Sequence, residues 1–460
     1  MSTQETPSTE SADVVVVGSR CAGSAAAIAL ARRGARVIAL DTAQFPSDTL
    51  STHLFWPSHW AEIERLGALA RVRELGAPEH THAGLAGGGV DVEGPFPVVE
   101  GFGHGSCVKR TGLDMALVET AREAGAEVRE RTRVTDLLRD GSGRVSGVRW
   151  KRRDGAEGTI DAKLVIGADG RNSTVAKLVE ATNHHEWDNR RMMAFAYYDD
   201  VQADQRHIAK QWRVGDELAT SFPCDGDQTL VLLMPPVGRA DEFKADPVDA
   251  FERTVERFPD LVARLEGCER ASKVRTSVRH PSYFRHSHGP GWALAGDAGH
   301  FKDPVTAQGI RDALRFGRLL GEAVAPAVAA GPAAIDAAVL AWEHDRDAQC
   351  LDMYQWANGL GLADDVSPIE TAAYGWLKDR EDGAGEALAV FSRVRRPQEL
   401  FSVPNVARWT VRALREAPPR EVATTVARDV RREVARVREN VAFTRVRARS
   451  EAARRGAPVA

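Results

Sequence analysis

The chain has 460 residues, 43% of them hydrophobic and 27% charged, which is ordinary for a soluble globular protein large enough for two or three packed units. Lys and Arg number 61 against 65 Asp and Glu, so the net charge of −4 gives no electrostatic reason to expect a nucleic-acid partner. The five scattered cysteines form no C-x-x-C pair, so we expect no disulfide framework and no metal site.

The ends of the chain and its most apolar stretch carry no membrane signal. Residues 1–12 are polar, rich in Ser, Thr and Glu, unlike a signal peptide, and are expected to be disordered. The run from 321 to 342 is mostly Ala broken by Pro, Gly and Asp, which is too weak to span a bilayer. We therefore expect a cytoplasmic protein without a membrane span.

A βαβ unit opens the folded part of the chain. The β-branched run Asp13–Val17 predicts a buried strand, and Gly18 and Gly23 frame the turn into an Ala-rich helix. Asp41 ends the next strand 23 positions after Gly18 (41 − 18), close to the ~20 typical of a dinucleotide-binding unit, where it would bind a ribose hydroxyl. Arg20 stands where a glycine normally lets the backbone approach a pyrophosphate, and it would either neutralise that group or tilt the loop.

A second motif follows a later buried strand. Residues 160–166 run directly into Ala168, Asp169 and Gly170, and then into a helix start rich in capping residues. An Asp at a strand end beside a Gly suits a contact with a phosphate or a ribose. A capped turn without a ligand is the alternative.

A third motif follows the predicted strand Trp292–Ala295. Gly296 and Asp297 begin a loop that leads into a helix predicted from Ile310 to about Val328. The free N–H groups and the dipole of a helix that starts near Gln308 favour negative charge, and Gly309 allows close backbone approach. Asp297 could accept hydrogen bonds from a sugar-alcohol chain.

Between the second and third motifs the pattern changes. Strand-like pieces alternate with turns from residue 184 to 278, interrupted by one helix predicted over Pro247–Phe258. This pattern predicts a mostly antiparallel sheet inserted into the nucleotide-binding fold, a natural floor for a substrate pocket. Most of its aromatic and sulfur side chains are expected to be core.

The last part of the chain is predicted to be helical. Residues 362–386 are acidic and are interpreted as loop-rich, whereas residues 419–455 form one long amphipathic helix. Its valines recur at helical spacing: Val422, Val426, Val430, Val434, Val437 and Val441. We expect this helix to pack on the body of the protein or on a second copy, as a homodimer, rather than on a membrane.

Together, and in this order, the three motifs resemble those of the single-component FAD-dependent monooxygenases of the aromatic-hydroxylase type. These enzymes share a glutathione-reductase-like FAD fold with geranylgeranyl reductases and flavin-dependent halogenases. The resemblance spans Asp13 to about Val328 and implies an α/β fold. A Rossmann-like FAD-binding domain would cover 13–80, 108–183 and 281–345, an inserted mostly antiparallel substrate domain 81–107 and 184–280, and a helical C-terminal region 346–460.

The resemblance also implies roles for single residues. Gly18, Gly23 and Asp41 would hold the ADP half of FAD, Arg110 would reach its pyrophosphate, and Asp169 would help to bind the pyrophosphate and NAD(P)H. Asp297, which follows Gly296 in the cofactor loop, would bind the ribitol, Pro304 would pack near the isoalloxazine, and the backbone of Gln308, Gly309 and Ile310 would face its pyrimidine end. Arg20 is counted with the cofactor-binding residues but departs from the family glycine, so the resemblance implies no role for it. His53 would lie near the ring.

The implied reaction is hydride transfer from NAD(P)H to flavin N5, followed by O₂ addition at C4a and delivery of one oxygen from the hydroperoxide to an aromatic or phenolic small molecule. The helix dipole at Gln308 would stabilise the anionic reduced flavin. A phenol needs a base, and His53, His300, Tyr198 and His280 are the candidates.

Two other functions remain open on the sequence. One is a flavin-dependent reductase of C=C bonds of the geranylgeranyl-reductase type, whose substrate-domain pattern is loosely matched by Phe222-Pro223. The other is a non-catalytic flavin-binding interaction protein. A halogenase is disfavoured, because the chain has no Trp-x-Trp-x-Ile-Pro stretch and Lys302 is too near the flavin loop to match the halogenase lysine.

Overall fold

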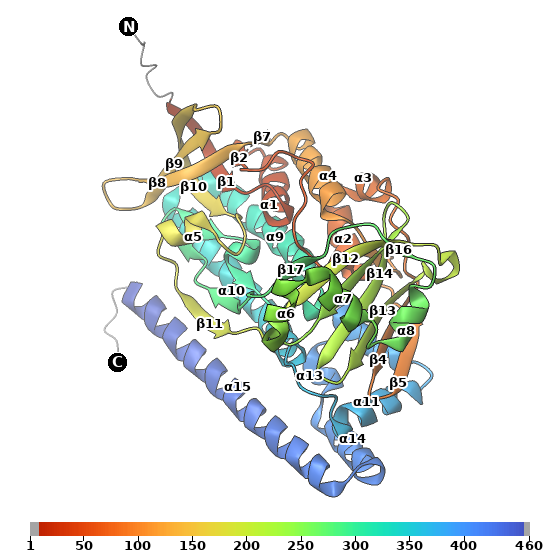
Figure 1. The fold of residues 1–460 in the computed structure, drawn as a ribbon. Coiled ribbons are helices and arrows are strands. Elements are labelled where there is room, and N and C mark those ends of the chain that lie inside the picture. The colour runs from red at the N-terminus through yellow and green to blue at the C-terminus, as the bar shows by residue number, and fades with distance from the viewer. Residues whose placement is uncertain (1–8, 455–460) are drawn as a thin grey trace.

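The computed structural model describes residues 9–454 and shows two large sheets with helices around them (Figure 1). This confirms the predicted class: a mixed α/β protein with a nucleotide-binding sheet, a mostly antiparallel second sheet and a helical C-terminal region. Where each segment of the chain falls among the predicted domains stays a prediction.

The first sheet has the strand order β19-β20-β10-β1-β2-β7, in which β20 to β7 are parallel and β19 is antiparallel to β20. Its strands are β1 Thr9–Val17, β2 Val37–Leu40, β7 Glu127–Arg129, β8 Thr132–Arg139, β9 Val145–Arg152, β10 Glu157–Gly167, β19 His288–Gly289 and β20 Trp292–Leu294. In register, Val17 pairs with Leu40 and with Gly167, and Gly167 pairs with Leu294. The carboxyl ends of four strands therefore meet at one edge, directly before the three predicted motifs.

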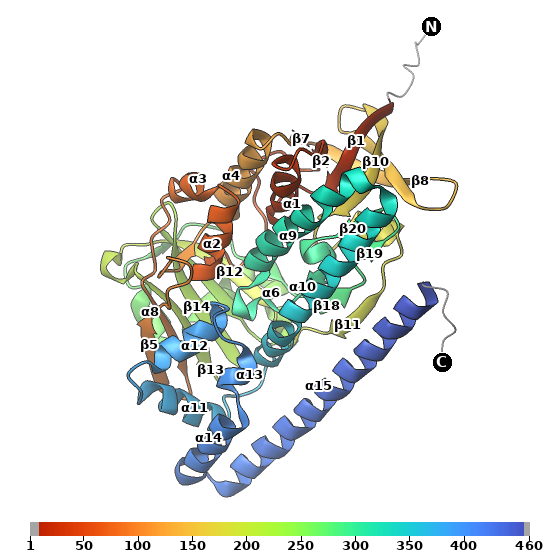
Figure 2. The ribbon, with the colours of Figure 1, turned by 180° about the vertical axis from the view of Figure 1, so that it is seen from behind.

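Helices cover one face of this sheet (Figure 2). They are α1 Cys21–Ala31, α2 Pro57–Arg65, α3 Leu69–Arg73, α4 Arg110–Glu123, α9 Gly309–Ala330 and α10 Pro332–Leu360. The short α5 Thr174–Leu178 packs with the antiparallel β8–β9 pair on the other face. Buried valines and isoleucines of β1 and β10 fill both layers, as expected for central parallel strands.

The second sheet is mostly antiparallel, in the order β16-β12-β15-β14-β13-β4-β5. Its strands are β3 Leu54–Phe55, β4 His82–Gly87, β5 Val90–Pro95, β6 Ser106–Cys107, β12 Met193–Asp199, β13 Ile208–Val214, β14 Glu217–Cys224, β15 Gln228–Met234, β16 Glu269–Arg270 and β17 Arg275–Ser277. A small third sheet joins β11 Asn183–Trp187, β18 Ser282–Arg285 and β21 His300–Phe301. Helices α6 Ala240–Ala245, α7 Pro247–Val255 and α8 Pro259–Arg264 lie over one face of the second sheet (Figure 1).

The sequence predicts disorder or loops in two segments that are in fact regular secondary structure. Residues 9–12, expected to be disordered, extend β1, where they pair with residues 159–162 of β10; residues 1–8 lie outside the described part. Residues 362–386, expected to be loops, contain α11 Pro368–Lys378 and the start of α12 Gly383–Phe391. Ser367 and Glu370 form a capping box that starts α11, which outweighs the acidic composition.

The C-terminal region continues with α13 Pro397–Leu400, α14 Val403–Glu416 and α15 Pro419–Arg454. The long amphipathic helix is thereby confirmed. Within residues 9–454, every helix is either too short or too polar to cross a bilayer.

The backbones of helices α1 and α9 pack directly against each other, because glycines of α9 face α1. A Cβ added at Gly321 would lie 2.7 Å from the Ala26 carbonyl oxygen, and one at Gly317 would lie 2.4 Å from the Ala22 carbonyl oxygen. These glycines let the two helix backbones touch, so the loops that precede α1 and α9 are held close together.

We predict that Gly321→Ala lowers the free energy of unfolding by about 1–3 kcal/mol, because the methyl group must separate α1 from α9. Gly359→Ala is the matched control in α10, since a Cβ there meets nothing within 4 Å. Thermal unfolding followed by circular dichroism measures both. Equal melting temperatures for the two variants would contradict the close-packing account.

Candidate active site

One large cavity lies at the carboxyl edge of the first sheet. Its volume is about 1010 Å³, at the upper end of the ~300–1,000 Å³ usual for ligand pockets. It is lined by nine of the predicted cofactor residues: Gly18, Arg20, Asp41, Arg110, Asp169, Asp297, Pro304, Gly309 and Ile310. Gly23, Gly296 and Gln308 are buried around it and do not line it.

The glycines of the first loop are required by backbone contacts. Gly18 has a φ of +96°, and a Cβ on it would lie 2.5 Å from the Ala168 carbonyl oxygen. A Cβ on Gly23 would lie 1.8 Å from the Gly18 carbonyl oxygen. The first and second motifs are therefore in backbone contact, and a side chain at either glycine would push the loop into the cavity.

Asp41 is held in place by the loop that it faces. Its carboxylate accepts hydrogen bonds from the backbone N–H groups of Ser19 and Ala43, each at 2.7 Å. Burial raises the pKa of Asp41, and these two bonds oppose that shift. A carboxylate fixed at the cavity wall in this way can still accept hydrogen bonds from ribose hydroxyls.

Asp169 has a clear structural role. Its carboxylate accepts hydrogen bonds from the Ser173 hydroxyl at 2.5 Å and from the Thr174 N–H at 2.6 Å, so it organises the turn into α5. These bonds match the capped-turn alternative. Asp169 nevertheless lines the cavity, so its predicted contact with the cofactor stays a prediction.

Arg20 and Arg110 share one buried carboxylate that sequence reasoning missed. The guanidinium of Arg110 donates to both oxygens of Asp114 at 2.8 and 2.9 Å, and Arg20 forms an ion pair with the same group. Arg20 also donates to the Ser47 carbonyl oxygen at 3.1 Å. Two positive charges face one negative charge at the cavity wall, which leaves net positive charge for an anionic pyrophosphate.

The third motif places a carboxylate and a helix N-terminus on the same cavity. Burial raises the pKa of Asp297, while the charges of Arg171, Lys302 and Arg110 oppose that shift. Among the described residues, nothing hydrogen-bonds its side-chain oxygens, so they are available to a polyol. The Asp303 carboxylate accepts a hydrogen bond from the Val305 N–H at 3.0 Å and so starts the turn that leads to Gly309, the first residue of α9.

His53 is a predicted base that follows a residue of the cavity wall but does not itself line the cavity. It is fully buried between Thr52, which lines the cavity, and β3. Its Nδ1 lies 2.7 Å from the Ser51 carbonyl oxygen and must carry the hydrogen, so its Nε2 accepts the hydroxyl hydrogen of Tyr197 at 2.8 Å. Burial lowers the pKa of His53 to about 4, which keeps the ring neutral.

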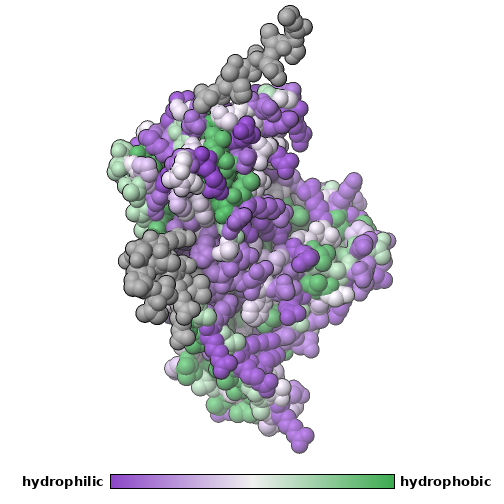
Figure 3. All heavy atoms as spheres, turned by 90° about the vertical axis from the view of Figure 1, so that its left-hand side faces the viewer, coloured by the Kyte–Doolittle hydropathy of each residue, from purple (hydrophilic) through white to green (hydrophobic). Residues whose placement is uncertain are grey.

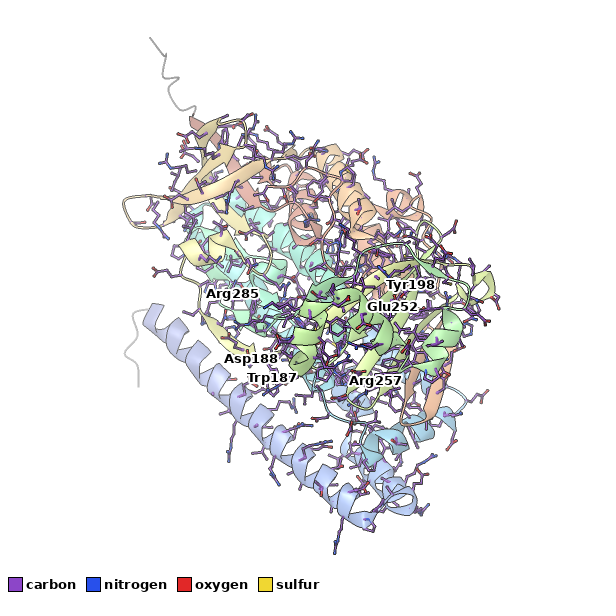
Figure 4. The ribbon with its side chains drawn as sticks, viewed as in Figure 1. Trp187, Asp188, Tyr198, Glu252, Arg257 and Arg285 are labelled. Carbon is purple, nitrogen blue, oxygen red and sulfur yellow. The ribbon has the colours of Figure 1, made fainter. Side chains whose placement is uncertain are left out.

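Tyr198, the predicted base on β12, lies away from the cavity. Its hydroxyl lies 3.2 Å from a carboxylate oxygen of Glu252 in α7, on the face of β12 turned away from the cavity (Figure 4). Neighbouring residues of a strand point to opposite faces, so Tyr197 lies on the same face of β12 as Met193, which lines the cavity, although Tyr197 itself does not.

The other two candidate bases are buried outside the cavity lining. His300 stacks on Phe284 with ring centroids 5.1 Å apart, and burial lowers its pKa to about 3. His280 is also buried, with a pKa lowered to about 4. Like His53, neither residue is among those that line the cavity or the apolar pocket described below.

A buried charge cluster lies behind the third motif. The carboxylate of Asp312 is bound by Lys302, by Arg311 at 2.8 Å and by Arg393 at 2.8 and 3.0 Å. His300, Asp312 and Cys350 are near enough to one another to hold a metal ion. The cations already on Asp312 would repel such an ion, so the cluster fits a structural role better.

A second, apolar pocket adjoins the cavity. It is lined by Thr52, Leu54, Trp56, Ala83, Gly84, Leu85, Ala209, Lys210, Gln211, Thr220, Phe222, Leu232, Met234, Pro304, Val305 and Ala307. Thr52, Pro304 and Ala307 line both spaces. Its one charged residue, Lys210, directs its ammonium to Asp91 at 2.6 Å, so only the aliphatic stem faces the pocket.

Comparison with known proteins agrees with this geometry. Residues 11–349 match the model of the FAD binding domain family, and the chain belongs to that family. A menaquinone reductase of Mycolicibacterium smegmatis is 31% identical over 324 residues, which are 68% of this chain and 76% of that protein. A digeranylgeranylglycerophospholipid reductase of Methanosarcina acetivorans is 27% identical over 436 residues, 89% of this chain and 98% of that protein.

Solved structures share the fold. A flavin-dependent brominase superposes with a TM-score of 0.73 at 21% identity, covering 88% of this chain and 99% of that one. A probable FAD-dependent monooxygenase from Pseudomonas aeruginosa has a TM-score of 0.64 at 19% identity, covering 82% and 99%. The protein is thus a FAD-dependent oxidoreductase, which sets aside the non-catalytic alternative.

The residues that are present fit FAD. The cavity joins a ribose-binding carboxylate, a net positive wall, a free carboxylate and a helix N-terminus, in the order that the parts of FAD require. Gly18, Asp41 and Asp169 would hold the adenosine and pyrophosphate end, Arg110 the pyrophosphate, and Asp297 the ribitol.

We predict that Arg110→Gln weakens FAD binding about 10- to 100-fold, because it removes a charge-assisted contact of ~1.5–3 kcal/mol. Arg122→Gln on the same helix is the control, since Arg122 pairs with Glu130 at the surface. Quenching of FAD fluorescence on titration of the apoprotein gives both dissociation constants. Equal values for the two variants would remove Arg110 from the binding site.

Proposed function

We propose that the protein is a FAD-dependent monooxygenase that consumes NAD(P)H and O₂ and hydroxylates a small aromatic or polycyclic substrate. The observation that carries this proposal is the apolar pocket that shares Thr52, Pro304 and Ala307 with the cofactor cavity. A substrate in that pocket would lie against the loop assigned to the isoalloxazine.

The pocket lining suits a flat apolar molecule. Trp56 and Phe222 offer aromatic surfaces, and Leu232 and Met234 close the floor formed by the second sheet. Trp56 Nε1 donates to the Thr306 carbonyl oxygen at 3.0 Å, so this ring is fixed to the loop that borders the cofactor space. The volume of the pocket is only about 20 Å³, roughly the space of one water molecule, so a substrate ring would enter only after the lining side chains move apart.

Tyr197 and His53 supply a neutral proton-handling pair beside this space. Burial raises the pKa of Tyr197 and lowers that of His53 to about 4, so neither side chain is charged at neutral pH. The Tyr197 hydroxyl donates its hydrogen to His53 Nε2, so its oxygen can accept a hydrogen bond from a substrate hydroxyl and assist its deprotonation. Bound FAD would supply the redox chemistry, taking hydride from NAD(P)H and activating O₂.

One comparison favours a second function, a flavin-dependent reductase of C=C bonds. The relative that is 31% identical carries the name menaquinone reductase, and the relative from Methanosarcina acetivorans is named as a reductase of a geranylgeranyl lipid. Hydroxylation and C=C reduction would both use reduced FAD and an apolar substrate. Only hydroxylation consumes O₂.

We predict that NAD(P)H oxidation is coupled to transfer of oxygen from O₂ to an aromatic substrate. The purified holoenzyme would be given NADPH or NADH, isotopically labelled O₂ and a panel of phenols and fused-ring aromatics, with mass spectrometry of the products. Labelled oxygen in a product supports the monooxygenase. A product that gains only hydrogen, and forms equally well without O₂, would establish the reductase instead.

We predict that Tyr197→Phe lowers kcat at least about tenfold, since assisted proton transfer typically contributes 10²- to 10⁴-fold. Tyr198→Phe should keep kcat near wild type, because its hydroxyl faces Glu252 on the other side of the sheet. Steady-state kinetics over a range of pH would show whether the loss lies in kcat or in KM. A larger effect of Tyr198→Phe would restore Tyr198 as the candidate.

A further inference from the structure

The polar side of α15, not its valine side, contacts the body of the protein. Arg432 donates to Asp364 at 2.6 Å, and Arg436 donates to Gln355 Oε1 at 3.0 Å. Asn440 accepts a hydrogen bond from Gln355 at 2.6 Å. Among the valines of α15 up to Val441, only Val422, at the start of the helix, is buried against the body. Figures 1 and 2 show α15 lying along the outside of the molecule from its junction with α14.

The valines that follow are left in solvent. Val426, Val430, Val434, Val437 and Val441 are each between 37% and 56% exposed. Seen from the side that faces left in Figure 1, most of the surface is hydrophilic, and hydrophobic atoms form separate patches at the top, at the right and at the lower end (Figure 3). An amphipathic helix whose apolar side faces away from its own protein has that side available for a partner.

The spacing of the valines is the spacing that lets a helix pair with a second, identical helix as a coiled coil. Val430, Val434, Val437 and Val441 alternate steps of four, three and four residues, as the a and d positions of a heptad do. Ala423 and Ala427 continue this pattern toward the start of the helix, and both are exposed. β-branched residues at these positions pack well as knobs into the holes of a facing helix.

The charges beside the valines determine the direction of pairing. With Val430 at d, Glu433 occupies a g position and Arg438 the e position five residues later. In a parallel pair, g of one helix faces that e position of the other, so Glu433 meets Arg438 of the partner subunit. An antiparallel pair would place like charges together. In the described part of the chain, Arg438 has no ion pair of its own, and Glu433 is bound by Arg436 at 2.9 Å on its own helix.

We propose that α15 pairs in parallel with α15 of a second copy of this chain, through the stripe Val430, Val434, Val437 and Val441. A lipid surface is the other candidate occupant, because residues 419–454 contain ten arginines against five acidic residues. Arg432 and Arg436 are, however, turned to the body, and Glu433 borders the stripe. The stripe is made of valines, whereas helices that bind membranes bury larger residues such as Trp, Phe and Leu.

The first test compares three proteins by sedimentation velocity, at concentrations up to about 100 µM, above the Kd of a weak specific interface. The full chain is expected to be a dimer, and Val430→Glu with Val437→Glu a monomer. Ala435→Glu with Ala442→Glu, on exposed positions away from the stripe, should remain a dimer. Circular dichroism and bound flavin confirm that each variant is folded.

A monomeric full chain, or dimerisation that survives the valine substitutions, would overturn the proposal. So would a monomer that binds vesicles containing phosphatidylserine only while the valines are intact, which would assign the stripe to lipid.

The second test distinguishes parallel from antiparallel pairing of the two α15 helices. Glu433→Arg places like charges together, as does Arg438→Glu, and each is expected to raise the dimer Kd by about two- to tenfold, the range for exposed ion pairs. The two substitutions together should restore the wild-type value. If the double variant is no tighter than the single variants, parallel pairing is wrong.

Discussion

The backbone contact between α1 and α9 is the constraint on which the cofactor cavity depends. Gly317 and Gly321 of α9 meet carbonyl oxygens of α1, and Gly23 meets the carbonyl of Gly18 within the first loop. Because the two helices are this close, the loops before them lie together at the carboxyl edge of the first sheet. Net positive charge from the first loop and the free carboxylate of the third then face one space.

The features that follow from local rules could be predicted from the sequence. Strand, glycine turn, helix and acidic residue are consecutive in the chain, and parallel strands align their ends, so the sequence alone was enough to place Gly18, Asp41 and Asp297. The partners of these residues could not be found in this way. Asp114 lies 94 positions from Arg20, and Tyr197 lies 144 positions from His53, so nothing local indicates either contact.

The orientation of Tyr197 and Tyr198 is a second feature that could not be predicted from the sequence. In a sheet with one exposed face, alternating polarity reveals which residues point inward. Strand β12 has no such face, because Phe195 packs on one side of the sheet while Ala194 and Ala196 pack under α7 on the other. The residue types around the two tyrosines therefore do not indicate which of them points toward the cavity. Only the pairing of β12 with its neighbours decides which hydroxyl reaches His53.

The C-terminal region is part of the site rather than an appendage to it. Arg393 donates to Gln308 Oε1 at 2.9 Å and to the Asp312 carboxylate, and the Gln308 amide donates to the Phe391 carbonyl oxygen at 2.7 Å. Asp312 lies in the first turn of α9 and is also bound by Lys302, which lines the cavity. The three cations on Asp312 hold its pKa well below the usual range despite full burial. A buried charged cluster that includes Arg393, just after α12, therefore ties the C-terminal region to the helix N-terminus that faces the cofactor space.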